Sequence, residues 1–141
     1  MSDNPIRPFS SASFNAYLEE NRLMASHCDR CNESYLPPRA VCPSCFGDQM
    51  SWRELDGTGR VAAITTVYIG PTFMNLLGYS KENPYMCGIV ELDDGLRISA
   101  RLLGSEEFEL EEVQIGTPVR VAFLRVGDEH SVKTQLAFLR K

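Results

Sequence analysis

The sequence predicts a mainly β protein, in which a short N-terminal helix and a metal-binding ribbon precede a five-stranded Greek-key barrel of the OB type. Two observations favour this fold class. Four cysteines stand in two close pairs within the first third of the chain. From Trp52 onward, apolar and polar residues alternate as in β-strands, and Gly, Pro and Asp interrupt the runs at intervals. We therefore expect three parts: an N-terminal extension (1–25), a ribbon (26–51) and a barrel (52–141).

The extension contains the one helix that the sequence predicts. Ser11 or Ser13 is expected to cap its start, and Asn21 is expected to adopt the left-handed conformation that ends it. Its apolar residues fall on one helical face: Phe14, Tyr17 and Leu18. A helix this short is not stable by itself in water. It must pack either on the rest of this chain or on a partner protein.

The cysteines follow the pattern Cys-x2-Cys-x10-Cys-x2-Cys, formed by Cys28, Cys31, Cys42 and Cys45. Two thiolates three positions apart can bind one ion from a single turn, and a second such pair completes a tetrahedron. An all-sulfur site has no open coordination position, so we expect it to organise the fold and not to catalyse. Zinc is the expected ion, and iron is the alternative.

The residues around the cysteines suit such a site. Asn32 follows the first pair and Gly47 lies two residues beyond the second, and both tolerate positive φ. Arg30 and Arg39 are close enough in sequence to offset the double negative charge of four thiolates around Zn²⁺. His27 adjoins the pairs, but four better-spaced thiolates already complete the ligand set.

Five apolar runs predict the strands of the barrel: 61–69, 86–92, 96–102, 119–125 and 132–139. Hairpin turns are expected at Asp93–Gly95 and at Gly127–Asp128. In the third run, Leu96, Ile98, Ala100 and Leu102 are expected to point inward, and Arg97, Ser99 and Arg101 outward. A five-stranded sandwich and an SH3-like barrel are the alternatives to the OB barrel.

Two connectors differ in character. Residues 70–84 carry many apolar side chains for a loop, which indicates either a lid on the barrel or a contact surface for a partner or an acyl chain. Residues 105–114 are acidic and indicate a solvated connector. Cys87 lies in an apolar run and is expected to be a buried, inert thiol.

No catalytic constellation is visible in the sequence. The two histidines, His27 and His130, have no nucleophile and acid at recognisable spacing, and no phosphate-binding glycine motif occurs. The sequence therefore predicts no catalytic residue and a protein that is not an enzyme.

Charge and hydropathy limit the partners and the location. The formal net charge is -5, which disfavours nonspecific nucleic-acid binding. A single-stranded nucleic-acid binder is still the alternative function, with its charge supplied by Arg97, Arg101, Arg120 and Arg125. No apolar stretch approaches the roughly 20 residues that span a bilayer, and no signal segment opens the chain. A cytoplasmic location is expected, where paired cysteines usually bind metal.

From about Phe14 to the C-terminus, the order of motifs resembles the family called domain of unknown function 35. The motifs are CDRC, YLPPRAVCPSC, Trp52, a glycine-flanked strand that ends in Thr65-Thr66-Val67, NPY at 83–85 and an Asp-Asp-Gly hairpin. The stretch 37–45 is the most specific part. Asn32 departs from the glycine that often follows the first cysteine pair in that family.

The resemblance implies a rubredoxin-like zinc ribbon joined to a C-terminal OB-fold, with Cys28, Cys31, Cys42 and Cys45 as ligands of a structural zinc. It also implies a non-catalytic scaffold in acyl-CoA and lipid metabolism. The implied partner is a thiolase-fold acyltransferase or aldolase, or a hot-dog hydratase, and an acyl-CoA is an implied ligand. No catalytic residue carries over from the family to this chain.

Overall fold

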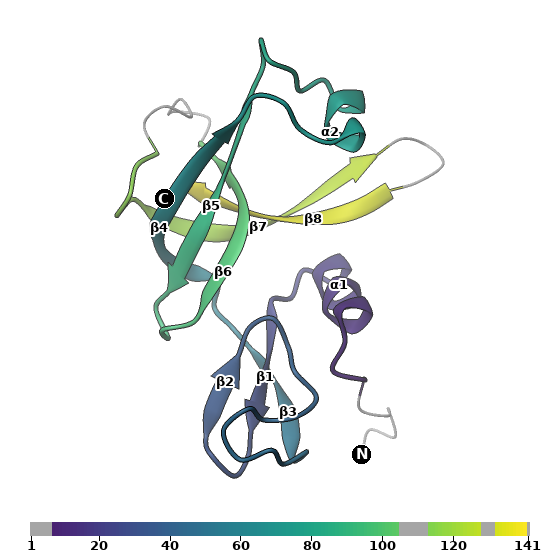
Figure 1. Ribbon diagram of the computed structural model, residues 1–141, viewed down its shortest axis with the longest axis vertical. Coiled ribbons are helices and arrows are strands. Elements are labelled where there is room, and N and C mark those ends of the chain that lie inside the picture. The colour runs from purple at the N-terminus through teal and green to yellow at the C-terminus, as the bar shows by residue number, and fades with distance from the viewer. Residues whose placement is uncertain (1–6, 105–112, 128–131, 141) are drawn as a thin grey trace. The chain divides into compact units, whose positions relative to one another are not determined.

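The computed structural model describes residues 7–104, 113–127 and 132–140. The chain forms two compact units, Met1–Asp56 and Gly57–Lys141 (Figure 1). The first unit holds one helix and a three-stranded sheet, and the second holds a closed barrel of five strands and a second short helix. The predicted mainly β fold class, with an N-terminal helix before a five-stranded barrel, is confirmed.

Helix α1 (Ser11–Glu19) begins one residue after its cap. Ser10 has an extended backbone, and its Oγ accepts a hydrogen bond from the Ser13 amide at 3.2 Å. The prediction of a cap at Ser11 or Ser13 was therefore wrong, because Ser10 is the serine whose oxygen faces a free amide of the first turn. Asn21, with φ of 61°, ends the helix as predicted.

Helix α1 packs on the ribbon of its own unit. Tyr17 meets the Trp52 ring edge-on, with centroids 5.0 Å apart, and Phe9 stacks on the same indole at 4.7 Å. The indole Nε1 donates to the carbonyl of Arg7 at 3.0 Å. Arg22 forms an ion pair with Glu54. Of the two docking modes left open by the sequence, internal packing is the one that the structure shows.

The ribbon sheet has the order β2-β1-β3, with antiparallel pairing throughout. Its strands are β1 (Met24–Cys28), β2 (Glu33–Tyr35) and β3 (Met50–Glu54). Strand β3 crosses the boundary expected between residues 51 and 52, and its pairing with β1 places Trp52 in the first unit. The division of the chain into 1–25, 26–51 and 52–141 stays a prediction.

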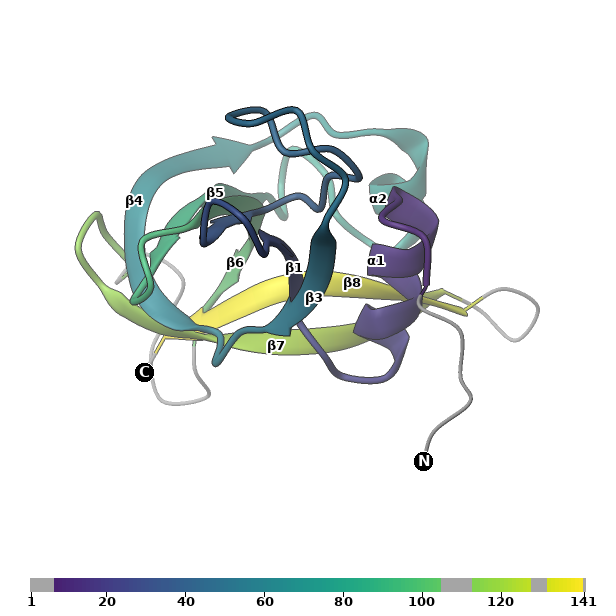
Figure 2. The same ribbon diagram turned by 90° about the horizontal axis from the view of Figure 1, so that it is seen from below.

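The second unit is a barrel with the strand order β4-β5-β6-β8-β7 (Figures 1 and 2). Strands β6 and β8 run parallel, and the other neighbouring pairs are antiparallel. This closed order with one parallel pair is the OB arrangement, and it excludes the sandwich. The strands are β4 (Thr58–Val67), β5 (Tyr85–Leu92), β6 (Arg97–Leu103), β7 (Pro118–Gly127) and β8 (Val132–Arg140).

The barrel core is aliphatic around one aromatic ring. Phe138 on β8 is fully buried, and it lies opposite Leu102 on β6 and Val121 on β7. The other buried core residues include Val61, Val90, Leu92, Val119 and Ala137. The turn at Asp93–Gly95 joins β5 to β6 as predicted, closed by a bond from the Gly95 amide to the Leu92 carbonyl.

Some predicted features lie outside the described residues. Most of the acidic connector 105–114 and the residues 128–131, with Asp128 and His130, belong to this group. Gly127 pairs with Val132 at the end of the antiparallel β7–β8 ladder. Across the described ranges, no helix is both long and apolar enough to cross a membrane.

Gly88 on β5 has no room for a side chain. A Cβ at this position would lie 2.2 Å from the carbonyl oxygen of Ala63 and 2.7 Å from Leu102 Cδ1. We expect Gly88→Ala to destabilise the barrel by about 1–3 kcal/mol, because backbone must move to admit the methyl group. Urea unfolding followed by far-UV circular dichroism measures the change. Thr65→Ala, exposed on β4, is the control and should stay within about 0.5 kcal/mol of the parent; equal stability of the two variants would contradict the expectation.

Candidate metal centre and barrel surface

The four paired cysteines converge on one point in the ribbon. Their Sγ atoms all lie within 4.8 Å of one another. The Cys28 and Cys45 sulfurs are 3.7 Å apart, and those of Cys31 and Cys42 are 3.9 Å apart. Cys28 and Cys42 are fully buried and pack with Met50, Phe9 and Tyr35. The spacing read from the sequence thus brings together the four sulfurs that it predicts.

Both cysteine pairs use the same turn. The Asn32 amide donates to the Cys28 carbonyl at 2.8 Å, and the Phe46 amide donates to the Cys42 carbonyl at 2.8 Å. Asn32 and Phe46 have positive φ, of 62° and 58°. The prediction that Gly47 supplies this conformation was wrong, because the turn needs it at the residue directly after each pair. Gly47 instead provides space, since a Cβ there would lie 3.3 Å from the Cys45 sulfur.

Hydrogen bonds around the sulfurs shift the pKa values of the Cys42 and Cys31 thiols in opposite directions. The Tyr35 hydroxyl lies 3.3 Å from the Cys42 sulfur, and this hydrogen bond is the main cause that lowers the pKa of the Cys42 thiol to about 6. The same bond raises the pKa of Tyr35 to about 12. Hydrogen bonding to Cys45 is the main cause that raises the pKa of Cys31 to about 12. Tyr35 was missed in the sequence, although it stands seven residues before Cys42.

These observations test the fit of a zinc ion. Four sulfur donors within one small group, two of them fully buried, match the soft tetrahedral site that Zn²⁺ prefers. A Cβ on Gly47 would lie 3.3 Å from the Cys45 sulfur and 3.5 Å from Arg30 Nη1. The Arg30 guanidinium is therefore close to the cluster, as predicted. Arg39 contributes a backbone bond, from its amide to Ser26 Oγ at 2.8 Å. The cluster fits a structural zinc.

His27 takes part in the ribbon framework and is not among the clustered groups. Its Nδ1 lies 2.8 Å from Ser34 Oγ, and its Nε2 lies 3.0 Å from Asn32 Oδ1. Both ring nitrogens are therefore engaged by side chains that flank the first cysteine turn. The hydrogen bond to Asn32 supports a residue that needs positive φ.

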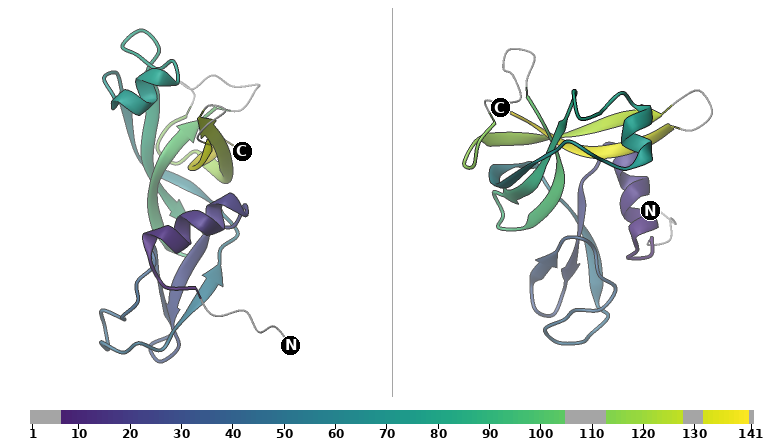
Figure 3. Two further views of the ribbon diagram at one scale, coloured as in Figure 1. Left: turned by 90° about the vertical axis from the view of Figure 1, so that its right-hand side faces the viewer. Right: turned by 45° about the horizontal axis from the view of Figure 1, so that its top comes forward.

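The connector 70–84 folds onto its own barrel. It contains α2 (Thr72–Leu76), which lies beside the β7–β8 hairpin in the views of Figure 3. Met74 is buried and accepts a weak bond from Gln135 Nε2 on β8 at 3.9 Å, while Tyr79 meets Tyr85 edge-on at 5.4 Å. The prediction that this segment is a lid on the barrel is thus correct for the side that carries Met74 and Tyr79. Its other side remains exposed.

Arg101 follows the predicted alternation but is not exposed as an outward-pointing residue is expected to be. The alternation places it outward, and the structure leaves it 7% exposed. Its guanidinium lies 4.4 Å from the centre of the Tyr79 ring and 5.9 Å from that of Tyr85, because the connector covers this face of β6. Arg97 pairs with Glu91. The nucleic-acid alternative therefore loses one of its four surface cations, and a second is paired.

Cys87 is only half-buried, so the prediction of a buried thiol was too strong. It lies on the outer side of β5, next to the buried Met86 and Gly88 in the chain. Partial burial raises the pKa of its thiol. At neutral pH this sulfur is therefore a thiol and a weak nucleophile.

A four-sulfur ribbon followed by a closed OB barrel defines a zinc-ribbon and OB-fold protein. The family model described as "ChsH2, C-terminal OB-fold domain" matches residues 52–124, slightly more than half of the chain, and "ChsH2, rubredoxin-like zinc ribbon domain" matches residues 16–51. The chain belongs to this ChsH2 family, which is also called DUF35. The predicted resemblance to domain of unknown function 35, and the predicted structural zinc, are confirmed.

Three relatives show how proteins similar to this chain are named. A DUF35 domain-containing scaffold protein of Methanocaldococcus jannaschii is 29% identical, over 76% of this chain and 71% of its own length. A probable enoyl-CoA hydratase alpha subunit of Thermomonospora curvata is 28% identical, over 79% of this chain and 32% of its own length. Benzoylsuccinyl-CoA thiolase subunit BbsA of Thauera aromatica is 29% identical, over 59% of this chain and 53% of its own length.

A solved structure agrees with these sequence matches. The chain from the structure named "Ltp2-ChsH2(DUF35) aldolase" superposes with a TM-score of 0.74 and 26% identity. The match covers 97% of this chain and 98% of that chain. The relatives and this structure together support the role of an accessory subunit.

Proposed function

We propose that this chain is a non-catalytic accessory subunit that scaffolds an enzyme acting on CoA thioesters. The observation that carries the proposal is that similar proteins are named as subunits of an enoyl-CoA hydratase and of a benzoylsuccinyl-CoA thiolase, and as scaffold proteins. A structure that is similar over nearly the whole chain is named an aldolase with ChsH2(DUF35). The expected partner is therefore a thiolase-fold acyltransferase or aldolase, or a hot-dog hydratase.

The ribbon supplies the scaffold's rigid part under this proposal. Cys28, Cys31, Cys42 and Cys45 are the proposed ligands of its zinc, supported by their mutual sulfur distances. A site of four sulfurs leaves no position for a substrate. The zinc itself would therefore not bind the acyl-CoA. We also propose a cytoplasmic location, where thiols stay reduced.

The proposed docking surface is the exposed side of residues 68–76, called the apolar ridge below. Ile69 and Leu76 are 84% and 81% exposed, and Tyr68 and Phe73 add two aromatic side chains. Tyrosine, phenylalanine and large aliphatic side chains form the buried centres of protein interfaces. The ridge is continuous in sequence and includes α2, whose Met74 anchors it to the barrel.

Charges on this ridge are expected to abolish binding to the partner enzyme. We predict that Ile69→Asp with Leu76→Asp prevents co-purification with a thiolase- or hydratase-type enzyme from the same organism. Loss of one buried anchor typically costs about 2 kcal/mol or more, or roughly 30-fold in affinity. Co-expression followed by affinity purification and size-exclusion chromatography measures the association.

Ile115→Asp is the matched control. Ile115 is 71% exposed on the same unit, but it lies outside the ridge. This variant should keep the complex. Retention of the complex by the double variant would exclude the ridge as the docking surface. Failure of the unaltered chain to associate with any such enzyme would contradict the accessory function itself.

A further inference from the structure

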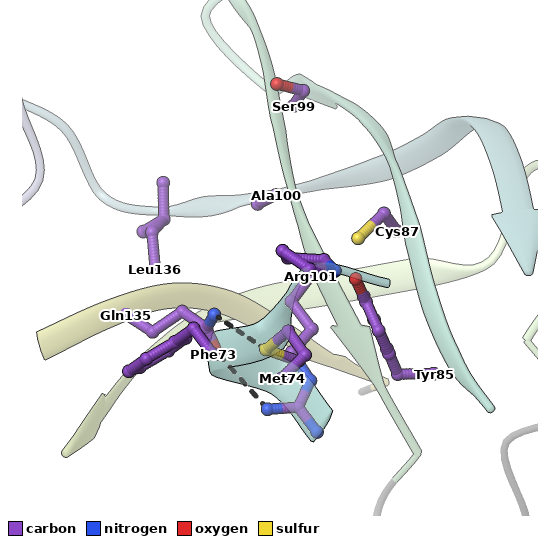
Figure 4. Close-up of a pocket in the computed structure, with 10 residues that line it drawn as sticks. Phe73, Met74, Tyr85, Cys87, Ser99, Ala100, Arg101, Gln135 and Leu136 are labelled. Carbon is purple, nitrogen blue, oxygen red and sulfur yellow. Dashed lines mark hydrogen bonds between the residues drawn. The ribbon is translucent and has the colours of Figure 1, made fainter. Parts of the chain in front are cut away.

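A cavity of about 400 Å³ lies between the connector and the outer face of the barrel. Its walls come from the start of α2, from β5 and β6, and from β8 (Figure 4). This volume is within the range of small-molecule sites in proteins. The proposed function does not use the cavity itself, although Phe73 belongs both to its wall and to the apolar ridge.

Most of the cavity wall is apolar. Phe73 and Met74 come from α2, and Leu136 comes from β8. Met74 is buried, and the Gln135 amide bonds both to its sulfur and to Arg101 (Figure 4). The wall therefore suits a hydrocarbon or aromatic group.

One cation interrupts this apolar wall. Arg101 lines the cavity, is 7% exposed, and forms one hydrogen bond to the described residues, from Nη1 to Gln135 Oε1 at 3.1 Å. Its Nε is buried and has no hydrogen-bond partner among the residues that the structure describes. The acceptor is a neutral amide, and no carboxylate of the described residues forms an ion pair with Arg101.

A buried guanidinium is unfavourable when it lacks a counter-ion, and none is found for Arg101 within 7–104, 113–127 and 132–140. Burial also lowers the pKa of Arg101. The planar guanidinium matches a carboxylate, which can accept two parallel hydrogen bonds. Lys133, 6.0 Å from the Phe73 ring, adds positive charge near the same wall of an otherwise acidic protein. One buried cation within apolar walls favours a singly charged, mostly apolar anion over a phosphate.

We propose that this cavity binds a small apolar monocarboxylate, whose carboxylate pairs with Arg101 and whose hydrocarbon part lies against Phe73, Met74 and Leu136. The inference is independent of the proposed function, because it concerns a small-molecule site on the barrel of this chain and requires no partner enzyme. The rings of Tyr79 and Tyr85 hold the guanidinium in place for the ligand.

Titration of the zinc-loaded full chain with octanoate and with 3-phenylpropanoate tests the site. Calorimetry and amide chemical shifts should report saturable binding with a Kd below about 1 mM, with shifts at 71–74, β6 and β8. The matched neutral amides, octanamide and 3-phenylpropanamide, should bind at least about 10-fold more weakly. Inorganic phosphate should not compete at equal concentration.

Arg101→Met removes the charge and keeps much of the volume. It should weaken binding of both acids about 10-fold, to the level of the amides. Arg97→Met, on the same strand and exposed, should bind like the parent. Equal affinity for acid and amide, competition by phosphate, unchanged binding by Arg101→Met or no saturable binding below about 10 mM would each overturn the proposal. The acid–amide comparison decides it even if Arg101→Met does not fold.

Discussion

Cys42→Ser is expected to unfold the ribbon unit and to lose the bound zinc. Cys42 is fully buried, and three of its neighbours in the cluster are the other proposed ligands. Zinc binding to such a site contributes on the order of 10 kcal/mol to folding, which is comparable to the whole net stability of a small domain. The zinc content found by metal analysis should fall from one ion per chain to a small fraction of that.

The single tryptophan of the chain reports this change directly. Trp52 lies on β3 of the ribbon unit, between Phe9 and Tyr17. Its fluorescence should shift to the red in Cys42→Ser, or in the parent after treatment with a strong chelator. The barrel, which lies in the other unit, should keep its β-type circular dichroism.

Cys87→Ser is the control for this experiment. Cys87 lies on β5 of the barrel and is not one of the four clustered sulfurs. This variant should keep one zinc per chain and the parent emission of Trp52. A Cys42→Ser variant with full zinc content and unshifted fluorescence would refute the assignment of Cys42 as a structural ligand.

Phe138→Ala is expected to have the largest effect on the barrel. The Phe138 side chain is 0% exposed and lies at the junction of β8 with its two neighbours, β6 and β7. Its removal should destabilise the barrel by about 3–5 kcal/mol, since apolar burial is lost and a cavity is left. Urea unfolding followed by far-UV circular dichroism measures the free energy of unfolding.

Val132→Ala is the matched control on the same strand. Val132 is exposed, and its truncation should change the free energy of unfolding by no more than about 0.5 kcal/mol. If Phe138→Ala were as stable as Val132→Ala, the barrel core would not be centred on this ring. The Trp52 signal should be unaffected by both variants, because it belongs to the other unit.

The candidate metal centre could be predicted closely from the sequence. Coordination by paired cysteines depends on short spacings along the chain, so local geometry already determines which sulfurs can meet. The error at Gly47 concerned which residue takes positive φ. Phe46 adopts this unfavourable conformation because the cysteine turn imposes it, and residue preference indicated glycine instead.

The strands were also predicted closely, since alternation and turn residues mark their bounds. β5 begins one residue before the predicted run, and β6 is shifted from its predicted run by one residue at both ends. The closed order, with β6 beside β8, depends on pairing between segments far apart in the chain. Alternation does not encode that pairing, so the sandwich and the SH3-like barrel remained alternatives until the register was known.

The sequence by itself determined the four clustered cysteines, the five barrel strands and the family, because each depends on short-range patterns. Only the tertiary structure determined the burial of Arg101 and the packing of the connector 70–84 over it. Alternation correctly assigned Arg101 to the outer face of β6, but Tyr79 and Met74 cover that face from another part of the chain. An outward-pointing side chain is exposed only if nothing packs over it, and that is a property of long-range packing.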